Sequence, residues 1–206
     1  MEFTMYLELF TAWAAFGLAA LSPGPNMVAV ASTALGEGRR AATLVALGIS
    51  CGALMWSLTT LYGLARLFEV YPQFLTVLSY LGGGYLLFLA SKGLRAAIRG
   101  GSANIKATGG ISGRKAFFHG LTVTATNPKV ALFWASIATF VTSVTQSNAF
   151  LVIFAFAIAF EAFMIYGSYG YIFSTSRSRQ IYNKAQRPIE GAFAFIFAGL
   201  GIALMI

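Results

Sequence analysis

The chain has 206 residues, of which 58% are hydrophobic and only 10% are charged, whereas a soluble domain carries about 25% charged residues. This composition excludes a water-soluble single domain. Crossing a bilayer takes roughly 20 consecutive apolar residues, and four charge-free stretches exceed that length: 9–36, 41–65, 70–91 and 130–160. The sequence therefore predicts a polytopic membrane protein.

An all-α fold with six transmembrane helices is expected, at 8–35, 42–65, 71–92, 116–141, 148–173 and 187–206. The longest connection, 100–113, is rich in glycine and serine and therefore flexible in composition. It separates two three-helix halves, 1–99 and 114–206, within one membrane domain. Because each half has an odd number of spans, the halves have opposite orientations in the bilayer, which is inverted-repeat topology.

The first expected helix is interrupted by the run Ser22-Pro23-Gly24-Pro25-Asn26. The two prolines remove two backbone donors and disfavour helical dihedrals at the residue before each of them. We therefore expect two half-helices in place of one continuous helix. Interrupted helices at membrane depth are a sequence indication of a transporter binding site, although an ordinary proline kink is the simpler alternative for one break alone.

Small residues mark the second and third helices. Gly48 and Gly52 are four residues apart in the second, and Gly82, Gly83 and Gly84 are consecutive in the third. Small residues let transmembrane helices approach closely. We expect internal helix packing at these positions, and the same surfaces would permit a homodimer.

The fourth helix carries a second interruption, at Asn127-Pro128-Lys129. Asparagine suits a helix N-cap, and proline suits the first position of the helix that follows. A new half-helix is thus expected to begin at Pro128. Two breaks in corresponding spans weaken the kink explanation and favour a site built from Ser22–Asn26 and Asn127–Lys129.

Two charges are expected deep in the membrane, Lys129 in the fourth helix and Glu161 in the fifth. Counted in residues from the cytoplasmic end of its helix, each of them lies about as deep as Ser22. All three residues are therefore expected near the mid-plane of the membrane. An intramembrane charge costs several kcal/mol unless it is paired or hydrated. The two residues could form a structural ion pair between helices. Alternatively, they belong to a substrate site, where Glu161 would bind the substrate and carry a coupling proton.

The loops differ sharply in positive charge. Twelve Lys and Arg residues fall on one side of the predicted topology: Arg39, Arg40, Lys92, Arg95, Arg99, Lys106, Arg114, Lys115, Arg177, Arg179, Lys184 and Arg187. Only Arg66 falls on the other side. Positive loops face the cytoplasm, so both termini are expected outside. The asymmetry also explains the net charge of +8 without a nucleic-acid partner.

Together, Ser22–Asn26 and Asn127–Lys129 resemble the motifs of the LysE/RhtB family of bacterial amino-acid exporters. The stretches 36–41, 81–86 and 199–201 also resemble that family. The segment 47–52 with Trp56, and Glu161, resemble its threonine/homoserine-efflux branch. The resemblance implies secondary export of amino acids across the bacterial inner (plasma) membrane, driven by an ion gradient.

The expected function is export of small neutral amino acids, threonine-like or homoserine-like, by proton-coupled antiport. Half-helix N-termini and Lys129 can receive the substrate carboxylate, and Glu161 or exposed carbonyls can receive its ammonium group. We expect no cofactor, metal ion or catalytic group. The chain has no Asp, one His and no HExxH or GxSxG motif, which disfavours an enzyme. The alternative is a membrane channel or assembly subunit without active transport.

Overall fold

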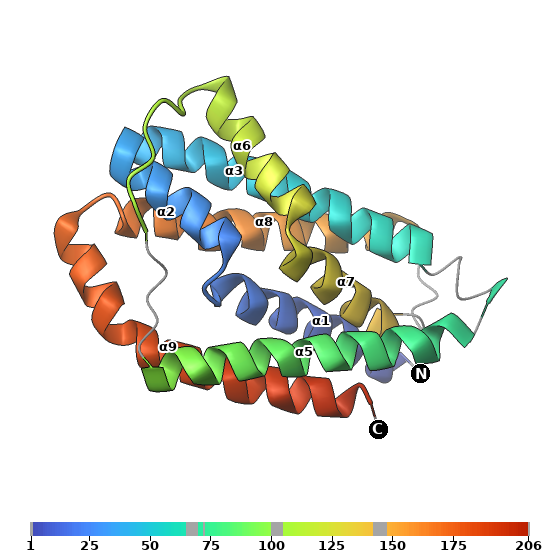
Figure 1. Cartoon of the computed structure of the whole chain (residues 1–206). Helices are drawn as coiled ribbons and strands as arrows, with labels where there is room; N and C mark the ends of the chain where they lie inside the picture. Colours follow the sequence, from blue (N-terminus) through green and yellow to red (C-terminus); the bar gives the residue numbers. More distant parts are fainter. Residues whose placement is uncertain (1, 65–69, 72, 100–104, 142–147, 206) are drawn as a thin grey trace.

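The computed structural model describes residues 2–64, 70–71, 73–99, 105–141 and 148–205. These residues form an all-helical protein (Figure 1). Its elements are α1 (Glu2–Leu21), α2 (Pro25–Glu37), α3 (Arg39–Leu58), the π-helical segment η1 (Thr59–Leu64), α5 (Gln73–Arg99), α6 (Arg114–Thr126), α7 (Pro128–Val141), α8 (Asn148–Ile172) and α9 (Ser176–Ala203).

Two of the predicted spans are divided into half-helices. The first becomes α1 and α2, and the fourth becomes α6 and α7, with breaks at the predicted prolines. Among the described residues, Arg39–Gly63 and Ala149–Ile172 are long and apolar enough to cross a membrane. A third candidate is the pair Leu9–Leu21 and Pro25–Glu37, which is bent by 47°. The protein is thus a helical membrane protein with interrupted helices.

The centre of the molecule is built around α3, which packs against both α6 and α8. Its inner face carries Ala42, Val45, Ala46, Ile49 and Ala53, all 5% exposed or less, at the spacing of one helix face. The crossing with α6 depends on glycine. A Cβ atom on Gly48 would lie 2.0 Å from the Phe117 carbonyl oxygen, and one on Gly120 would lie 2.0 Å from that of Val45. The predicted close packing at Gly48 is confirmed.

The third and last predicted spans, α5 and α9, lie side by side along most of their length (Figure 1). Their contact is again glycine-based: a Cβ atom on Gly83 would lie 2.7 Å from the carbonyl oxygen of Gly201. Gly82 faces Ser136 of α7, whereas a Cβ atom on Gly84 would meet nothing within 4 Å. The predicted contact face is therefore confirmed for Gly82 and Gly83 and is wrong for Gly84.

Large apolar side chains remain exposed on the outer faces of several helices. Ile153, Phe156 and Phe160 of α8 are 58–66% exposed, and Phe195 of α9 is 76% exposed. In water such a surface would be unfavourable, whereas lipid chains cover it at no cost. The exposed apolar side chains are therefore suited to contact with a bilayer.

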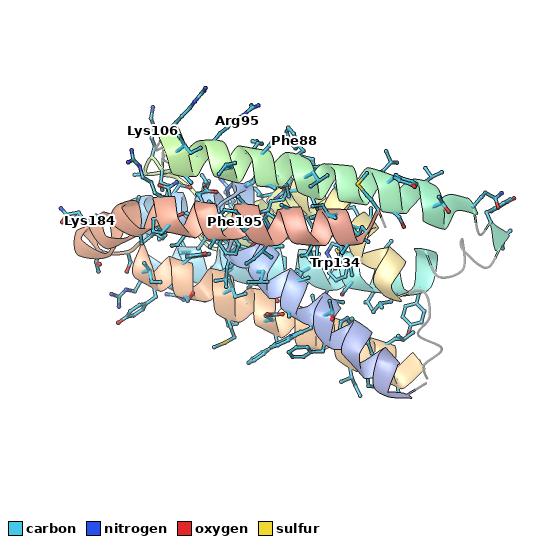
Figure 2. The ribbon with its side chains drawn as sticks, turned by 90° about the horizontal axis from the view of Figure 1, so that it is seen from below. Phe88, Arg95, Lys106, Trp134, Lys184 and Phe195 are labelled. Carbon is cyan, nitrogen blue, oxygen red and sulfur yellow. The ribbon has the colours of Figure 1, made fainter. Side chains whose placement is uncertain are left out.

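The helix ends define two ends of the molecule. The chain enters α1 and leaves α9 at one end (Figure 1), while Lys106 and Lys184 lie at the other (Figure 2). Part of the glycine-rich connection, residues 105–113, packs on α2, where the Thr108 N–H donates to the Ser32 carbonyl oxygen at 3.1 Å. A composition typical of a flexible linker thus accompanies a backbone held by hydrogen bonds.

The last helix begins earlier than the sequence predicts, at Ser176 instead of 187. Hydropathy identifies only the apolar part of a helix, and the residues before Pro188 are polar and basic. Tyr182 anchors this polar extension, since its ring lies 4.9 Å from that of Phe173 and its hydroxyl contacts the Met27 sulfur.

Candidate functional site

The first break lies between α1 and α2. Gly24 is fully extended, with φ −179° and ψ −176°, and Pro25 occupies the first turn of α2. No side chain caps the N-terminus of α2. Because proline has no N–H, the N–H groups of the following residues are the donors that this helix end presents.

The second break lies at Asn127, which has φ −76° and ψ 112°. Its side-chain oxygen accepts a hydrogen bond of 3.0 Å from the Lys129 N–H, so Asn127 is the N-cap of α7, as the sequence predicts. Its side-chain nitrogen donates to the Asn26 side-chain oxygen at 3.1 Å. Both asparagines are 4% exposed. The two breaks are therefore joined directly by a buried hydrogen bond.

Lys129 provides a second link between the breaks. Its ammonium group donates to the carbonyl oxygens of Ala19 and Ser22, each at 3.1 Å, to the Ser22 hydroxyl, and more weakly to the Pro23 carbonyl oxygen. The last carbonyls of a helix have no partner within it and carry partial negative charge. Lys129 thus caps the C-terminal end of α1 from α7.

Two tyrosines of α8 complete the polar contacts of the breaks. The Tyr169 hydroxyl donates to the Leu21 carbonyl oxygen at 2.7 Å, which satisfies another end carbonyl of α1. Tyr166, only 6% exposed, interacts with the Asn26 side chain. Sequence reasoning did not identify these tyrosines, because the fifth span contains several aromatic residues and its pattern does not single them out.

Two cavities meet at the breaks. The larger has a volume of about 410 Å³ and lies between the breaks and the α5/α9 pair. The smaller, about 30 Å³, lies against α1, α3, α6 and α8. Both are lined by Ser22, Gly24, Pro25, Asn127 and Lys129. Of the other predicted residues, Pro23 and Pro128 line the larger cavity and Asn26 the smaller. The structure thus brings eight of the nine predicted site residues together.

Glu161 is the ninth, and it lines neither of these cavities. Its carboxylate lies against Gly17, where a Cβ atom would be 2.3 Å from Oε1. Its Oε2 atom is buried and has no hydrogen-bond partner. Within the described part of the chain, Lys129 is held by the end of α1, and no ion pair joins it to Glu161. The ion pair between these two charges, one of the two alternatives from the sequence, is therefore not seen in the described residues.

The larger cavity contains charged residues that the sequence did not indicate, Lys92 of α5 and Glu190 of α9. Lys92 was counted among the positive charges of the cytoplasmic side, and Glu190, inside the last predicted span, was not singled out. A signal was present, however. Glu190, Phe193, Ala194 and Phe197 follow the spacing of one helix face, and all four line the cavity. No cluster of three metal-ligating His, Cys, Asp or Glu side chains occurs among the described residues.

Comparison with known proteins gives one family. The profile of the LysE type translocators matches residues 18–206. A threonine efflux protein of Salmonella typhi is 30% identical over an alignment of 208 positions that covers 98% of this chain and 99% of that relative. A threonine efflux protein of Escherichia coli strain K12 is 31% identical, covering 92% and 93%. An uncharacterized membrane protein of Haemophilus influenzae is 29% identical, covering 92% and 91%. No solved structure matches significantly.

Proposed function

Since the chain belongs to the LysE type translocator family, we propose that it is a secondary exporter of small neutral amino acids such as threonine or homoserine. The family is non-enzymatic, so the site acts by binding and conformational change. Relatives of nearly equal length are named threonine efflux proteins, which supports the substrate class. The observation that carries the proposal is the meeting of two broken helices at a cavity of about 410 Å³.

The substrate site consists of Ser22–Asn26 together with Asn127, Pro128 and Lys129. A zwitterion needs donors for its carboxylate and acceptors for its ammonium group. The uncapped N-terminus of α2 supplies N–H donors, and a helix N-terminus favours an anion. The end carbonyls of α1 supply acceptors, which Lys129 fills in the conformation described. Its positive charge still favours a carboxylate nearby, although its donors are committed.

Export is proposed to be coupled to proton entry, with Glu161 as the proton carrier. A buried carboxylate oxygen without a hydrogen-bond partner is costly in a membrane, and such groups usually have a function. Glu161 touches α1 at Gly17, five residues before the break, so a change in its charge would act on the half-helix that ends at the site.

The arrangement in the membrane follows from charge and connectivity. We propose six spans in two inverted three-helix halves, 1–99 and 114–206, in the bacterial inner membrane. The basic end that contains Lys106 and Lys184 faces the cytoplasm, and both termini are external. Gly48, Gly82 and Gly83 are used for internal packing in the monomer, so a homodimer could not use these positions.

Efflux from reconstituted vesicles tests the proposal. Vesicles loaded with a mixture of labelled amino acids should release threonine and close analogues selectively, and faster when the outside is acidic. Vesicles loaded with the same amino acids but prepared without the protein are the control for leakage. Release of all amino acids at equal rates, or of none, would contradict the proposed function. Selective release that does not depend on the pH gradient would contradict only the proton coupling.

A further inference from the structure

The larger cavity contains three charged side chains from three different helices: Lys92 of α5, Lys129 of α7 and Glu190 of α9. Phe88, Leu89, Phe193 and Phe197 form an apolar wall around them. Pockets that bind small molecules have volumes of about 300–1,000 Å³, with few polar groups in an apolar lining. At about 410 Å³, this cavity has the size and lining of such a pocket.

The two lysines have different surroundings. The ammonium group of Lys129 is committed to oxygen atoms at the end of α1. That of Lys92 lies over the Phe88 ring, 5.5 Å from its centroid. Neither lysine forms an ion pair within 4.0 Å with Glu190 in the described structure, although both interact with it electrostatically. Glu190 is therefore close enough to both lysines to feel their charge, but it makes no direct ion pair with either in the described part of the chain.

Glu190 is the carboxylate of this cavity. It is half-buried and interacts with the Gln186 side chain one turn earlier in α9. Its position is fixed by the contact between α9 and α5, since a Cβ atom on Gly93 would lie 3.1 Å from the Glu190 carbonyl oxygen. A half-buried carboxylate in an apolar cavity, without a direct cationic partner, can accept hydrogen bonds from a ligand.

We propose that Glu190 receives the ammonium group of the transported amino acid. This inference rests on the proposed function and adds a residue to it. The ammonium group is a donor of three charge-assisted hydrogen bonds, and Glu190 is the acidic side chain that lines the cavity. The substrate carboxylate would then lie toward the lysines and the N-terminus of α2, and its short side chain would face the aromatic wall.

The test compares threonine with its analogue that carries a hydroxyl in place of the ammonium group. Each compound competes with labelled threonine for uptake into vesicles that contain the full-length protein. The wild-type protein should prefer threonine to the analogue. In Glu190→Gln, threonine affinity should fall by about tenfold or more, since a charged hydrogen-bond partner is lost, whereas the affinity of the analogue should change by less than about threefold. Glu37→Gln, the same change at a residue that lines neither cavity, is the matched control and should keep the wild-type preference.

The outcomes separate the inference from the proposed function. A wild-type protein that transports no amino acid contradicts the proposed function itself. An active wild-type protein, with equal losses for threonine and analogue in Glu190→Gln, contradicts the role of Glu190 alone. If Glu190→Gln does not insert, Glu190→Asp is measured instead. It keeps the charge but withdraws it by one methylene, so threonine affinity should again fall more than that of the analogue, and an equal fall overturns the inference.

Discussion

At the scale of single residues, Lys129 combines a structural contact with a position at both cavities. Its ammonium group satisfies the end carbonyls of α1 and at the same time places a charge between two cavities. The sequence identified Lys129 as a deep charge but suggested Glu161 as its partner. Backbone carbonyls freed by a helix break cannot be seen as a partner in sequence, because they carry no side-chain signature.

A double-mutant cycle tests this assignment. Lys129→Met removes the ammonium donor from the Ala19 and Ser22 carbonyl oxygens and should lower the free energy of unfolding by about 1–3 kcal/mol. Because Lys129 and Glu161 share no contact, the effects of Lys129→Met and Glu161→Gln should add, with a coupling energy below about 0.5 kcal/mol. Unfolding in mixed micelles measures the free energy of unfolding of each variant, from which the coupling energy is calculated. A coupling energy above about 1 kcal/mol would show that the two charges interact after all.

At the scale of elements, the two broken helices were predictable because proline and asparagine act locally. Pro25 and Pro128 begin half-helices, and Asn127 caps one of them. What the sequence could not show is that the breaks meet through the Asn26–Asn127 hydrogen bond, since that contact depends on how distant helices pack. The polar start of α9 is a local feature, but it was missed because hydropathy detects only the apolar part of a helix.

Removing the second break should therefore damage transport more than insertion. Pro128→Ala frees Asn127 to adopt helical dihedrals, so that α6 and α7 can join into one helix and the N-cap is lost. We expect normal expression and at least about a tenfold loss of efflux, since small displacements of a site cost rate factors of that order or more.

Pro188→Ala provides the matched control for this change. Pro188 lies inside α9 and lines neither cavity, so replacing it restores a backbone donor without affecting a break. Efflux should then remain near the wild-type rate. Equal rates for Pro128→Ala and the wild-type protein, at equal amounts in the membrane, would mean that the fourth-span break is dispensable.

At the scale of the whole molecule, composition alone indicated a helical membrane protein, and glycine spacing indicated where its helices approach. The division of the molecule into a central group around α3 and an α5/α9 pair was not predictable, because it depends on which faces meet. The larger cavity lies between the pair and the breaks, so under the proposed function this division places the substrate site between the two parts. Movement of the pair relative to the centre would change access to that cavity.

Counterflow of threonine tests the central claim, that the molecule is a carrier whose site alternates between the two sides of the membrane. Vesicles containing the protein and a high concentration of unlabelled threonine are diluted into a trace of labelled threonine. A carrier exchanges one molecule for the other, so the label should accumulate transiently above its external concentration and then decline. A steady approach to equal concentrations without an overshoot, at a rate that rises linearly with threonine, would contradict the account and indicate a channel.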